Sequence, residues 1–279
     1  MTAGLWVLIL VLFVLVFLLL VSAAIFCAAF VRFPKRAEEK LETREDPEPL
    51  INEGVRWIRE QNCKKVEIRS YDGLRLAARV LPAENAKGTL ILIHGYRSPM
   101  YHDFACILPF YHALGYNLLI PSQRTHGESE GKYICYGIRE RYDCKAWAAF
   151  AETYFEPGGD IFLSGVSMGS ATVLMASDLT LPDTVRGIIA DCGFRDCSTL
   201  ESVANTKLPI LFVHGKADTF VPCRFTEENY AACRSEKELV LVENAGHGMS
   251  YLLETERCQQ ILKNFLERYS GCKRSMSTN

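Results

Sequence analysis

The chain has 279 residues, of which 49% are hydrophobic and 23% are charged, and its formal net charge is −2. This length is sufficient for one domain with a well-formed hydrophobic core. The charge is nearly balanced and forms no basic stripe, so nucleic acid is not expected as a partner. The sequence contains neither internal repeats nor low-complexity tracts.

The N-terminal segment 5–31 reads LWVLILVLFVLVFLLLVSAAIFCAAFV and contains no charged residue. A helix of about 20 residues already crosses the hydrocarbon core of a bilayer. The alternative is a cleaved signal peptide with Ser22-Ala23-Ala24 as its cleavage site. A signal peptide has a basic start and an apolar stretch of roughly 7–15 residues, and this segment has neither. We therefore expect residues 1–31 to be a retained transmembrane anchor.

The charges that flank this segment predict its orientation. No Lys or Arg precedes it, whereas Arg32, Lys35, Arg36, Lys40 and Arg44 follow it closely. By the positive-inside rule, the domain that follows lies in the cytoplasm and the protein is a single-pass protein of the cell membrane.

Eleven cysteines occur in the chain. They are scattered and form no Cys-x-x-Cys pair, a pattern that suits a reducing compartment and indicates neither a zinc site nor a redox motif. Most of them are expected to be small buried apolar residues. We expect no metal ion and no organic cofactor.

After the anchor, residues 32–62 are expected to form a charged stalk that ends in a short amphipathic helix. Trp57 of that helix could rest on the membrane surface or on the domain. Residues 63–270 are expected to form the main domain, and residues 271–279 a tail. The domain begins with two strand-like runs joined by Asp72-Gly73, a dipeptide typical of hairpin turns.

Beyond this hairpin, apolar strand-like runs alternate with helical segments. The strands are expected at 89–95, 116–124, 160–167, 185–192, 208–215 and 238–245. The helices are expected at 103–114, 138–155, 223–233 and 250–268, with another after Gly169. This alternation predicts an α/β fold with a mostly parallel, doubly wound sheet and an antiparallel N-terminal hairpin at one edge.

The segment Gly165-Val166-Ser167-Met168-Gly169 fits the pattern Gly-x-Ser-x-Gly where an expected strand ends and a helix begins. In that context the pattern is typical of a nucleophile elbow, a strained turn that exposes the serine. Side chains at the two glycines would collide with the neighbouring strand and helix. The helix N-terminus also favours developing negative charge. Ser167 is therefore the predicted nucleophile.

A serine hydroxyl is a poor nucleophile without a base, and in this fold the order along the chain is Ser, then Asp or Glu, then His. Asp218 follows one expected strand and His247 follows the next, at the sheet edge where such residues meet. We predict that Ser167, Asp218 and His247 form a catalytic triad. Asp191, at the end of an earlier strand, is the rival acid.

The remaining histidines are expected to have structural roles. His94 ends a strand before the serine, His126 braces the site from a neighbouring loop, and His214 packs at a strand end. His102 and His112 are expected in a loop and on a helix surface.

Six segments in order, HGYRS, RTHGESEG, ERYDCKAW, GVSMG, ADTFVP and AGHGMSY, together resemble the α/β-hydrolase superfamily. More narrowly, they are similar to single-span, membrane-anchored bacterial hydrolases of the serine aminopeptidase-like type. The similarity covers residues 64–269. The resemblance implies the same triad and an oxyanion hole formed by the backbone N–H groups of Tyr96 and Met168.

One segment differs from that pattern. In such relatives the strand that resembles IIADCGF is followed by a longer helical insertion that caps the site. Here residues 193–207 are enough for the connecting helix and nothing more, and Ser198 or Thr199 with Glu201 is expected to start that helix. We therefore expect an open, shallow acyl pocket and a preference for short acyl groups.

These features support three hypotheses. The first is a membrane-anchored serine hydrolase that cleaves an ester or thioester, from a small-molecule acyl substrate or a lipid-derived one, through an acyl-enzyme. The second is a peptidase or aminopeptidase with the same triad. The third is a catalytically weak, capless binding or scaffold protein.

Overall fold

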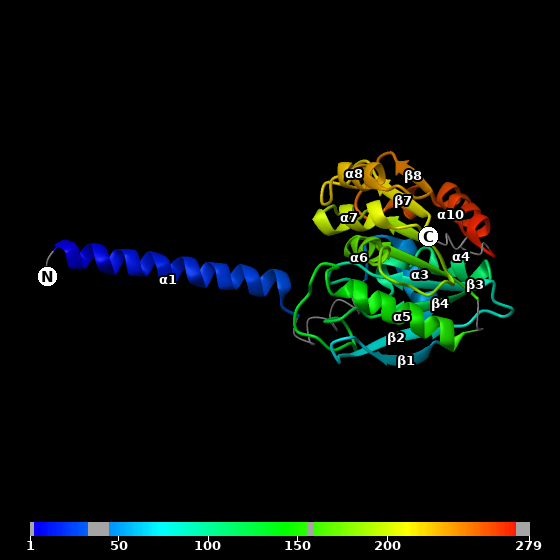
Figure 1. Cartoon of the computed structure of the whole chain (residues 1–279), viewed down its shortest axis with the longest axis horizontal. Coiled ribbons are helices and arrows are strands. Elements are labelled where there is room, and N and C mark those ends of the chain that lie inside the picture. Colours follow the sequence, from blue (N-terminus) through cyan, green and yellow to red (C-terminus); the bar gives the residue numbers. More distant parts are fainter. Residues whose placement is uncertain (1–2, 33–44, 156–158, 272–279) are drawn as a thin grey trace, which may run out of the picture.

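The computed structural model describes residues 3–32, 45–155 and 159–271 (Figure 1). Residues 33–44 of the expected stalk and residues 272–279 of the expected tail lie outside the described residues. The apolar N-terminal segment forms the helix α1 (Ala3–Phe30), which projects from the domain with exposed side chains. Within the described ranges, α1 alone is long and apolar enough to cross a membrane, a property of length and composition that signal sequences share.

An eight-stranded sheet in the order β1-β2-β4-β3-β5-β6-β7-β8 forms the centre of the domain. The hairpin strands β1 (Lys64–Arg69) and β2 (Arg75–Leu81) pair antiparallel, and β2 pairs antiparallel with β4. The other pairs are all parallel. These strands are β3 (Gly88–Ile93), β4 (Tyr116–Pro121), β5 (Asp160–Val166), β6 (Val185–Asp191), β7 (Ile210–Gly215) and β8 (Lys237–Val242). The expected fold class is confirmed.

The chain winds outward in both directions from β3, which lies between β4 and β5. In open sheets of this kind, ligands bind outside the carboxyl ends of the strands, beside the point where the winding reverses. That edge carries the loops after β3, β4, β5, β7 and β8. The residues that follow these strands are therefore brought to one side of the domain.

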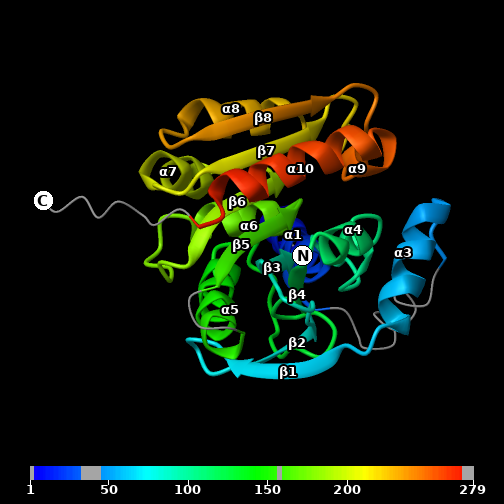
Figure 2. The same cartoon turned by 90° about the vertical axis from the view of Figure 1, so that its right-hand side faces the viewer.

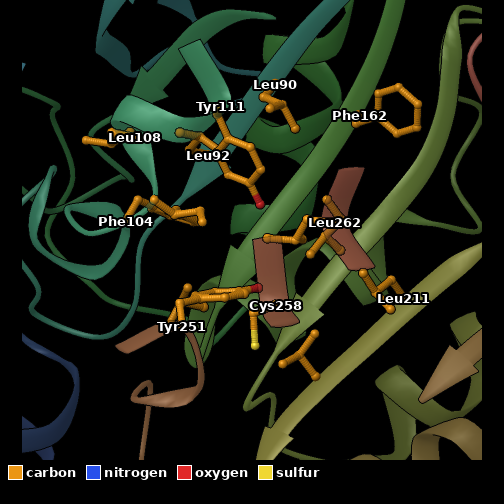
Figure 3. Close-up of a cluster of buried hydrophobic side chains, with 14 of the residues drawn as sticks. Leu90, Leu92, Phe104, Leu108, Tyr111, Phe162, Leu211, Tyr251, Cys258 and Leu262 are labelled. Carbon is orange, nitrogen blue, oxygen red and sulfur yellow. The ribbon is translucent and has the colours of Figure 1, made fainter. Parts of the chain in front are cut away.

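Helices cover both faces of the sheet because alternate residues of each buried strand face opposite layers. Leu90 and Leu92 of β3 pack on one face with Phe104, Tyr111 and Leu262, as Figure 3 shows. The helices of this layer are α3 (Pro49–Glu60), η1 (His102–Phe104), α4 (Leu108–Ala113), α9 (Ser250–Leu253) and α10 (Thr255–Tyr269).

The opposite layer packs against the other residues of the same strands, such as Ile91 and Ile93 of β3. Its helices are α5 (Glu140–Tyr154), α6 (Met168–Ala176), α7 (Cys197–Asn205) and α8 (Arg224–Ala232). Figure 2 shows α10 and α4 on the near side of the sheet. The domain therefore has two hydrophobic cores, one between the sheet and each helical layer.

The expected short amphipathic helix forms as α3, whose Ile51 and Ile58 are buried. Trp57 packs against the domain core, with its ring centroid 5.9 Å from that of His112. Of the two expected alternatives, the membrane surface and the domain, Trp57 therefore rests on the domain. His112 lies on α4 as expected, and its Nε2 bonds to the Pro82 carbonyl at 3.1 Å.

Between β6 and β7 the chain, which is described throughout this stretch, forms the single helix α7 and short loops. Its N-cap is Asp196, and Thr199, one of the residues expected to help start the helix, pairs with it. The Asp196 carboxylate accepts the Thr199 N–H at 2.8 Å, while the Thr199 hydroxyl accepts the Asp196 N–H at 2.9 Å. This reciprocal capping box places Thr199 inside the first turn and the extended Asp196 before it.

Candidate active site

Ser167 lies in the turn between β5 and α6, with φ 56° and ψ −116°. Few residues other than glycine adopt such a backbone, and its strain is maintained by the surrounding packing. A Cβ at Gly169 would lie 1.8 Å from the Ile93 carbonyl oxygen, and one at Gly165 would lie 2.2 Å from the Gly169 oxygen. The close approach of helix and strand therefore requires both glycines, as the sequence pattern predicted.

Three side chains from different strand ends form one chain of hydrogen bonds. The Ser167 hydroxyl lies 2.9 Å from His247 Nε2, and His247 Nδ1 lies 2.7 Å from Asp218 Oδ2. Asp218 follows β7 and His247 follows β8. The imidazole can thus donate its Nδ1 proton to the carboxylate and accept the serine proton at Nε2. This is the arrangement of the three residues that the sequence predicted.

Asp218 is buried, and the loop after β7 supplies several donors to its carboxylate. Oδ1 accepts the backbone N–H groups of Phe220 and Val221 at 2.8 and 2.9 Å. Burial alone would raise the pKa of this carboxyl, but the hydrogen bond from His247 and those from the backbone hold it below its usual value. The group is therefore an anion that can stabilise an imidazolium.

His214, the last residue but one of β7, is a second neighbour of the same carboxylate. Its Nε2 lies 3.1 Å from Asp218 Oδ2 and 3.0 Å from the Val221 carbonyl oxygen, while Nδ1 lies 2.6 Å from the Thr226 hydroxyl. Burial lowers the pKa of the imidazole, which is consistent with a neutral ring. The expected packed histidine is thus also a donor to Asp218, a contact that its sequence position did not indicate.

The rival acid, Asp191, ends β6 with its carboxylate buried. Its backbone carbonyl accepts the Ser167 N–H at 2.9 Å, but neither carboxylate oxygen has a hydrogen-bond partner within the described residues. Burial, together with the nearby Asp218 and Asp103 carboxylates, raises its pKa to about 8. The structure therefore brings His247 to Asp218 and leaves Asp191 outside the hydrogen-bonded chain.

The two expected oxyanion donors are backbone N–H groups beside Ser167. Met168 is the first residue of α6, and the loop with Tyr96 passes so close that a Cβ on Gly95 would lie 3.3 Å from the Ser167 Cβ. Within the described ranges, neither the Tyr96 N–H nor the Met168 N–H donates to another group. Both are therefore available to an oxygen that develops negative charge.

Two buried histidines hold the loop that follows β3. His94 Nδ1 lies 2.9 Å from the Gly95 carbonyl oxygen, and its Nε2 accepts the Gln123 N–H at 3.0 Å. His126 Nε2 accepts the Arg97 N–H at 3.0 Å. Burial lowers the pKa of His94 and lowers that of His126 to about 3, so both rings remain neutral acceptors of these N–H groups. His126 occupies the bracing position that its sequence context indicated.

Asp103 is a supporting residue that sequence reasoning missed. Its carboxylate accepts the Gly95 N–H at 2.6 Å and the Ser98 hydroxyl at 2.5 Å. His102 bonds to Asp103 at 3.3 Å and to Asp46 at 2.8 Å, and these carboxylates raise its pKa to about 9. The expected loop histidine is thus a cation that ties residue 46 to the same loop. The sequence feature that could have indicated this role is the position of Asp103 directly after His102.

One group of potential metal ligands occurs among the described residues. Cys192 Sγ, an Asp218 oxygen and a His247 nitrogen lie within 4.8 Å of one another. The hydrogen bond between Asp218 and His247 already occupies two of these positions. Burial also raises the pKa of the Cys192 thiol well above its ordinary value, which disfavours the thiolate that metals bind. The group therefore fits a proton relay better than a cation site.

Comparisons with known proteins show what the chain is similar to. The family model described as phospholipase/carboxylesterase matches residues 152–269, a range that includes Ser167, Asp218 and His247. The chain is 27% identical over 217 residues to the uncharacterized protein YqkD of Bacillus subtilis, a match that covers 64% of this chain and 71% of the relative.

Solved structures resemble the domain as well. The Pyrococcus furiosus esterase Pf2001 aligns with a TM-score of 0.69 and 22% identity, over 76% of this chain and 94% of the esterase. A predicted CIB-like hydrolase from Thermoplasma acidophilum aligns with a TM-score of 0.57 and 26% identity, over 74% of this chain and 98% of that one. The sheet order and these likenesses show that the domain has the α/β-hydrolase fold.

Proposed function

We propose that the protein is a membrane-anchored serine hydrolase that cleaves an ester or thioester through an acyl-enzyme. The observation that carries this proposal is the unbroken hydrogen-bonded chain from Ser167 through His247 to Asp218, which starts in a strained turn. A nucleophile, a base and an orienting acid in reach of one another are the parts that acyl transfer requires.

In the first step, Ser167 Oγ attacks the carbonyl carbon of the substrate while His247 Nε2 takes the hydroxyl proton. Asp218 holds the imidazole in the tautomer that leaves Nε2 free, and it stabilises the imidazolium that forms. The N–H groups of Tyr96 and Met168 bind the oxyanion. The bond from carbon to the leaving oxygen or sulfur then breaks, and His247 returns the proton to that atom.

In the second step, water attacks the acyl-serine by the same route in reverse. His247 takes a proton from the water, the acid product leaves, and the proton returns to Ser167 Oγ. Each step conserves atoms and charge with no redox partner. The chemistry is therefore complete with the groups of this one site.

Two findings favour an ester or thioester over an amide. The matching family model is described as phospholipase/carboxylesterase, and one structural neighbour is the esterase Pf2001. In addition, the chain between β6 and β7, all of which is described, forms only α7 and short loops and so supplies no cap at that position. An open site gives little help in excluding water, and esters and thioesters are the more reactive acyl donors.

The anchor and its orientation are part of the same proposal. The helix α1 has the length and composition of a membrane span, and five basic residues follow it while none precedes it. We expect protease added to intact cells or right-side-out vesicles to spare the domain. Digestion from outside would contradict the cytoplasmic location, while leaving the proposed chemistry intact.

The proposed nucleophile is tested with a fluorophosphonate probe. The variant Ser167→Ala should lose labelling and turnover, because it removes the attacking hydroxyl while alanine still fits the turn. The matched control is Ser177→Ala, a buried serine at the C-cap of α6 that lies outside the hydrogen-bonded chain. Labelling that survives in Ser167→Ala would overturn the assignment.

A panel of acyl p-nitrophenyl esters, thioesters and aminoacyl amides identifies the scissile bond. We expect turnover of esters or thioesters that depends on Ser167. Faster cleavage of the amides would replace the esterase proposal with a peptidase that uses the same residues. If no substrate turns over and no probe reacts, the protein is a non-catalytic member of the fold.

A further inference from the structure

The C-terminal end of α1 is bound by two loops at the catalytic edge of the domain. We call these the docking loops, residues 96–97 after β3 and residues 127–136 after β4. Arg32 donates to the carbonyls of Ser129 and Gly127 at 2.6 and 2.5 Å, and Val31 forms a β-bridge with Tyr133. The helix therefore continues into the domain through ordered backbone contacts.

The last carbonyl groups of a helix lack partners within it, and in α1 tyrosines of the docking loops satisfy them. The Tyr96 hydroxyl donates to Ala29 O at 2.9 Å and to Ala28 O at 3.3 Å, and the Tyr136 hydroxyl donates to Ala29 O at 3.1 Å. The Arg97 guanidinium donates to Val31 O at 3.0 Å. Residues 96 and 97 thus link the end of α1 to the loop that carries a proposed oxyanion donor.

Aromatic and basic side chains surround this junction. Phe26 of α1 lies 5.8 Å from the Tyr133 ring, Phe30 lies 5.4 Å from the Tyr136 ring, and the Lys132 ammonium lies over Tyr133. Aromatic rings with adjacent cations are typical of the level at which a span leaves the hydrocarbon core. The junction therefore has the composition of a membrane–water interface.

The catalytic edge of the sheet faces this interface. The docking loops follow β3 and β4, and Ser167, Asp218 and His247 follow parallel strands of the same sheet, so all lie at its carboxyl edge. Figure 1 shows α1 pointing directly away from the domain, and in Figure 2 it lies behind the middle of the sheet. A span tilts only about 20° from the bilayer normal on average, which turns this edge toward the lipid surface.

Phe220 is exposed on the same edge beside the proposed base. It is 73% exposed, and its ring lies 5.1 Å from the imidazole of His247. With Tyr133 and Ile138, each 42% exposed, it supplies apolar surface on loops of this edge. Such side chains lower the free energy of contact with lipid acyl chains.

We propose that the active site opens onto the membrane surface and accepts long-chain acyl esters of glycerol from the bilayer. This inference rests on the proposed serine hydrolase function and names its substrate class. The bilayer takes the place of the missing protein cap, because it holds the acyl chain and presents the ester carbonyl at the interface. The bilayer does not hold the acyl chain of a water-soluble substrate, so for such substrates we still expect a preference for short acyl groups.

The test uses the full-length chain in vesicles of a diether phosphatidylcholine, which contains no acyl ester. The substrates are monooleoylglycerol in the same vesicles and p-nitrophenyl butyrate in the water. The double variant Tyr133→Asp/Ile138→Asp places two carboxylates where the apolar surface meets lipid, a position that disfavours charge. We expect hydrolysis of the vesicle-borne ester to fall about tenfold or more, while turnover of the soluble ester stays within about threefold.

The matched control is Tyr154→Asp, which adds a carboxylate at an exposed tyrosine at the end of α5. It should leave both rates unchanged, because α5 leads into the amino end of β5, at the opposite edge of the sheet. Equal loss in the control and the double variant would mean that charge alone, wherever it lies, weakens vesicle binding, and would overturn the inference.

The outcomes separate this inference from the proposed function. If the wild type turns over the soluble ester but leaves vesicle-borne monooleoylglycerol intact, the hydrolase stands and the membrane-facing site is wrong. The same holds if the double variant matches the wild type on both substrates. If neither ester is cleaved and the fluorophosphonate does not react, the proposed function itself fails.

A second measurement locates the site without using turnover. A short fluorescent fluorophosphonate bound at Ser167 should be quenched by nitroxide groups on lipid head groups in the vesicles more strongly than by iodide in the water. Quenching by iodide alone would place the site away from the bilayer and would overturn the inference.

Discussion

The ends of β6 and β7 each carry a buried carboxylate, but their surroundings differ. Asp218 accepts two backbone N–H groups and lies against the imidazoles of His247 and His214. Asp191, one strand away, offers its backbone carbonyl to Ser167, while its carboxylate has no partner among the described residues. A position after a strand end therefore does not suffice to make a triad acid. The loop must also turn its donors toward the carboxylate.

The largest expected effect separates these two acids directly. Asp218→Asn should lower kcat by several orders of magnitude, on the order of 10⁴ as in the serine-protease precedent, because the amide favours the wrong imidazole tautomer. Asp191→Asn should reduce kcat by less than about tenfold, since its carboxylate does not touch His247. Steady-state turnover of a soluble ester measures both effects.

Circular dichroism provides the control for folding, since both variants should keep a native-like secondary structure. Should Asp191→Asn prove the more damaging change, the acid would be misassigned and the contrast between the two strand ends would reverse.

A smaller effect is expected from the support that His214 gives to Asp218. His214→Phe keeps a ring of similar shape but removes the donor 3.1 Å from Asp218 Oδ2. We expect kcat to fall about tenfold, which corresponds to about 1.4 kcal/mol of lost transition-state stabilisation. The acid limb of the pH–rate profile should shift as well, because the Asp218 charge acts on the protonation of His247.

That shift distinguishes a positioning role from general loss of packing. A lower kcat with an unmoved pH profile would mean that His214 acts through packing alone. The interpretation that two imidazoles share one carboxylate would then be incorrect.

Substitution of Asp191 is expected to have the smallest effect on turnover. The protonation of its carboxyl should nevertheless have a clear effect on the stability of the fold. Its folded pKa is raised to about 8 by burial, so between about pH 4 and pH 8 the folded chain keeps a proton that the unfolded chain releases. The stability of the wild type should therefore fall as the pH rises through this window.

Asp191→Asn removes this titration and makes the comparison measurable. We compare the free energy of unfolding of the variant with that of the wild type at each pH. The difference, variant minus wild type, should increase by more than about 2 kcal/mol between about pH 5 and pH 9, since each pKa unit corresponds to about 1.4 kcal/mol. Urea unfolding of the full-length protein in detergent measures this difference. A difference that stays constant with pH would indicate that Asp191 is already ionised in the fold.

Local sequence patterns were enough to predict much of the fold. The hairpin at Asp72-Gly73, the parallel strands and the turn at Ser167 follow from turn chemistry and from apolar runs bounded by glycine, which act over a few residues. The boundaries of these elements differ by a few residues from the expected ones, since helix and strand ends depend on caps and pairing partners. The capping residue Asp196 is one such difference.

Other features required contacts between distant segments. The hydrogen bond between Asp218 and His247 joins residues 29 positions apart. The roles of Asp103, His214 and Cys192 likewise depend on neighbours that no local pattern specifies. The hydrogen bonds from Tyr96 and Tyr136 to the end of α1 join residues 67 and 107 positions apart.

The sequence by itself therefore determined the α/β architecture, the apolar span and the three residues of the hydrogen-bonded chain, because each is encoded by a short pattern of residue types. Tertiary structure alone decided that His214 also meets the Asp218 carboxylate and which edge of the domain meets the span. Both depend on the directions in which side chains leave separate strand ends, and those directions are set by packing across the whole sheet.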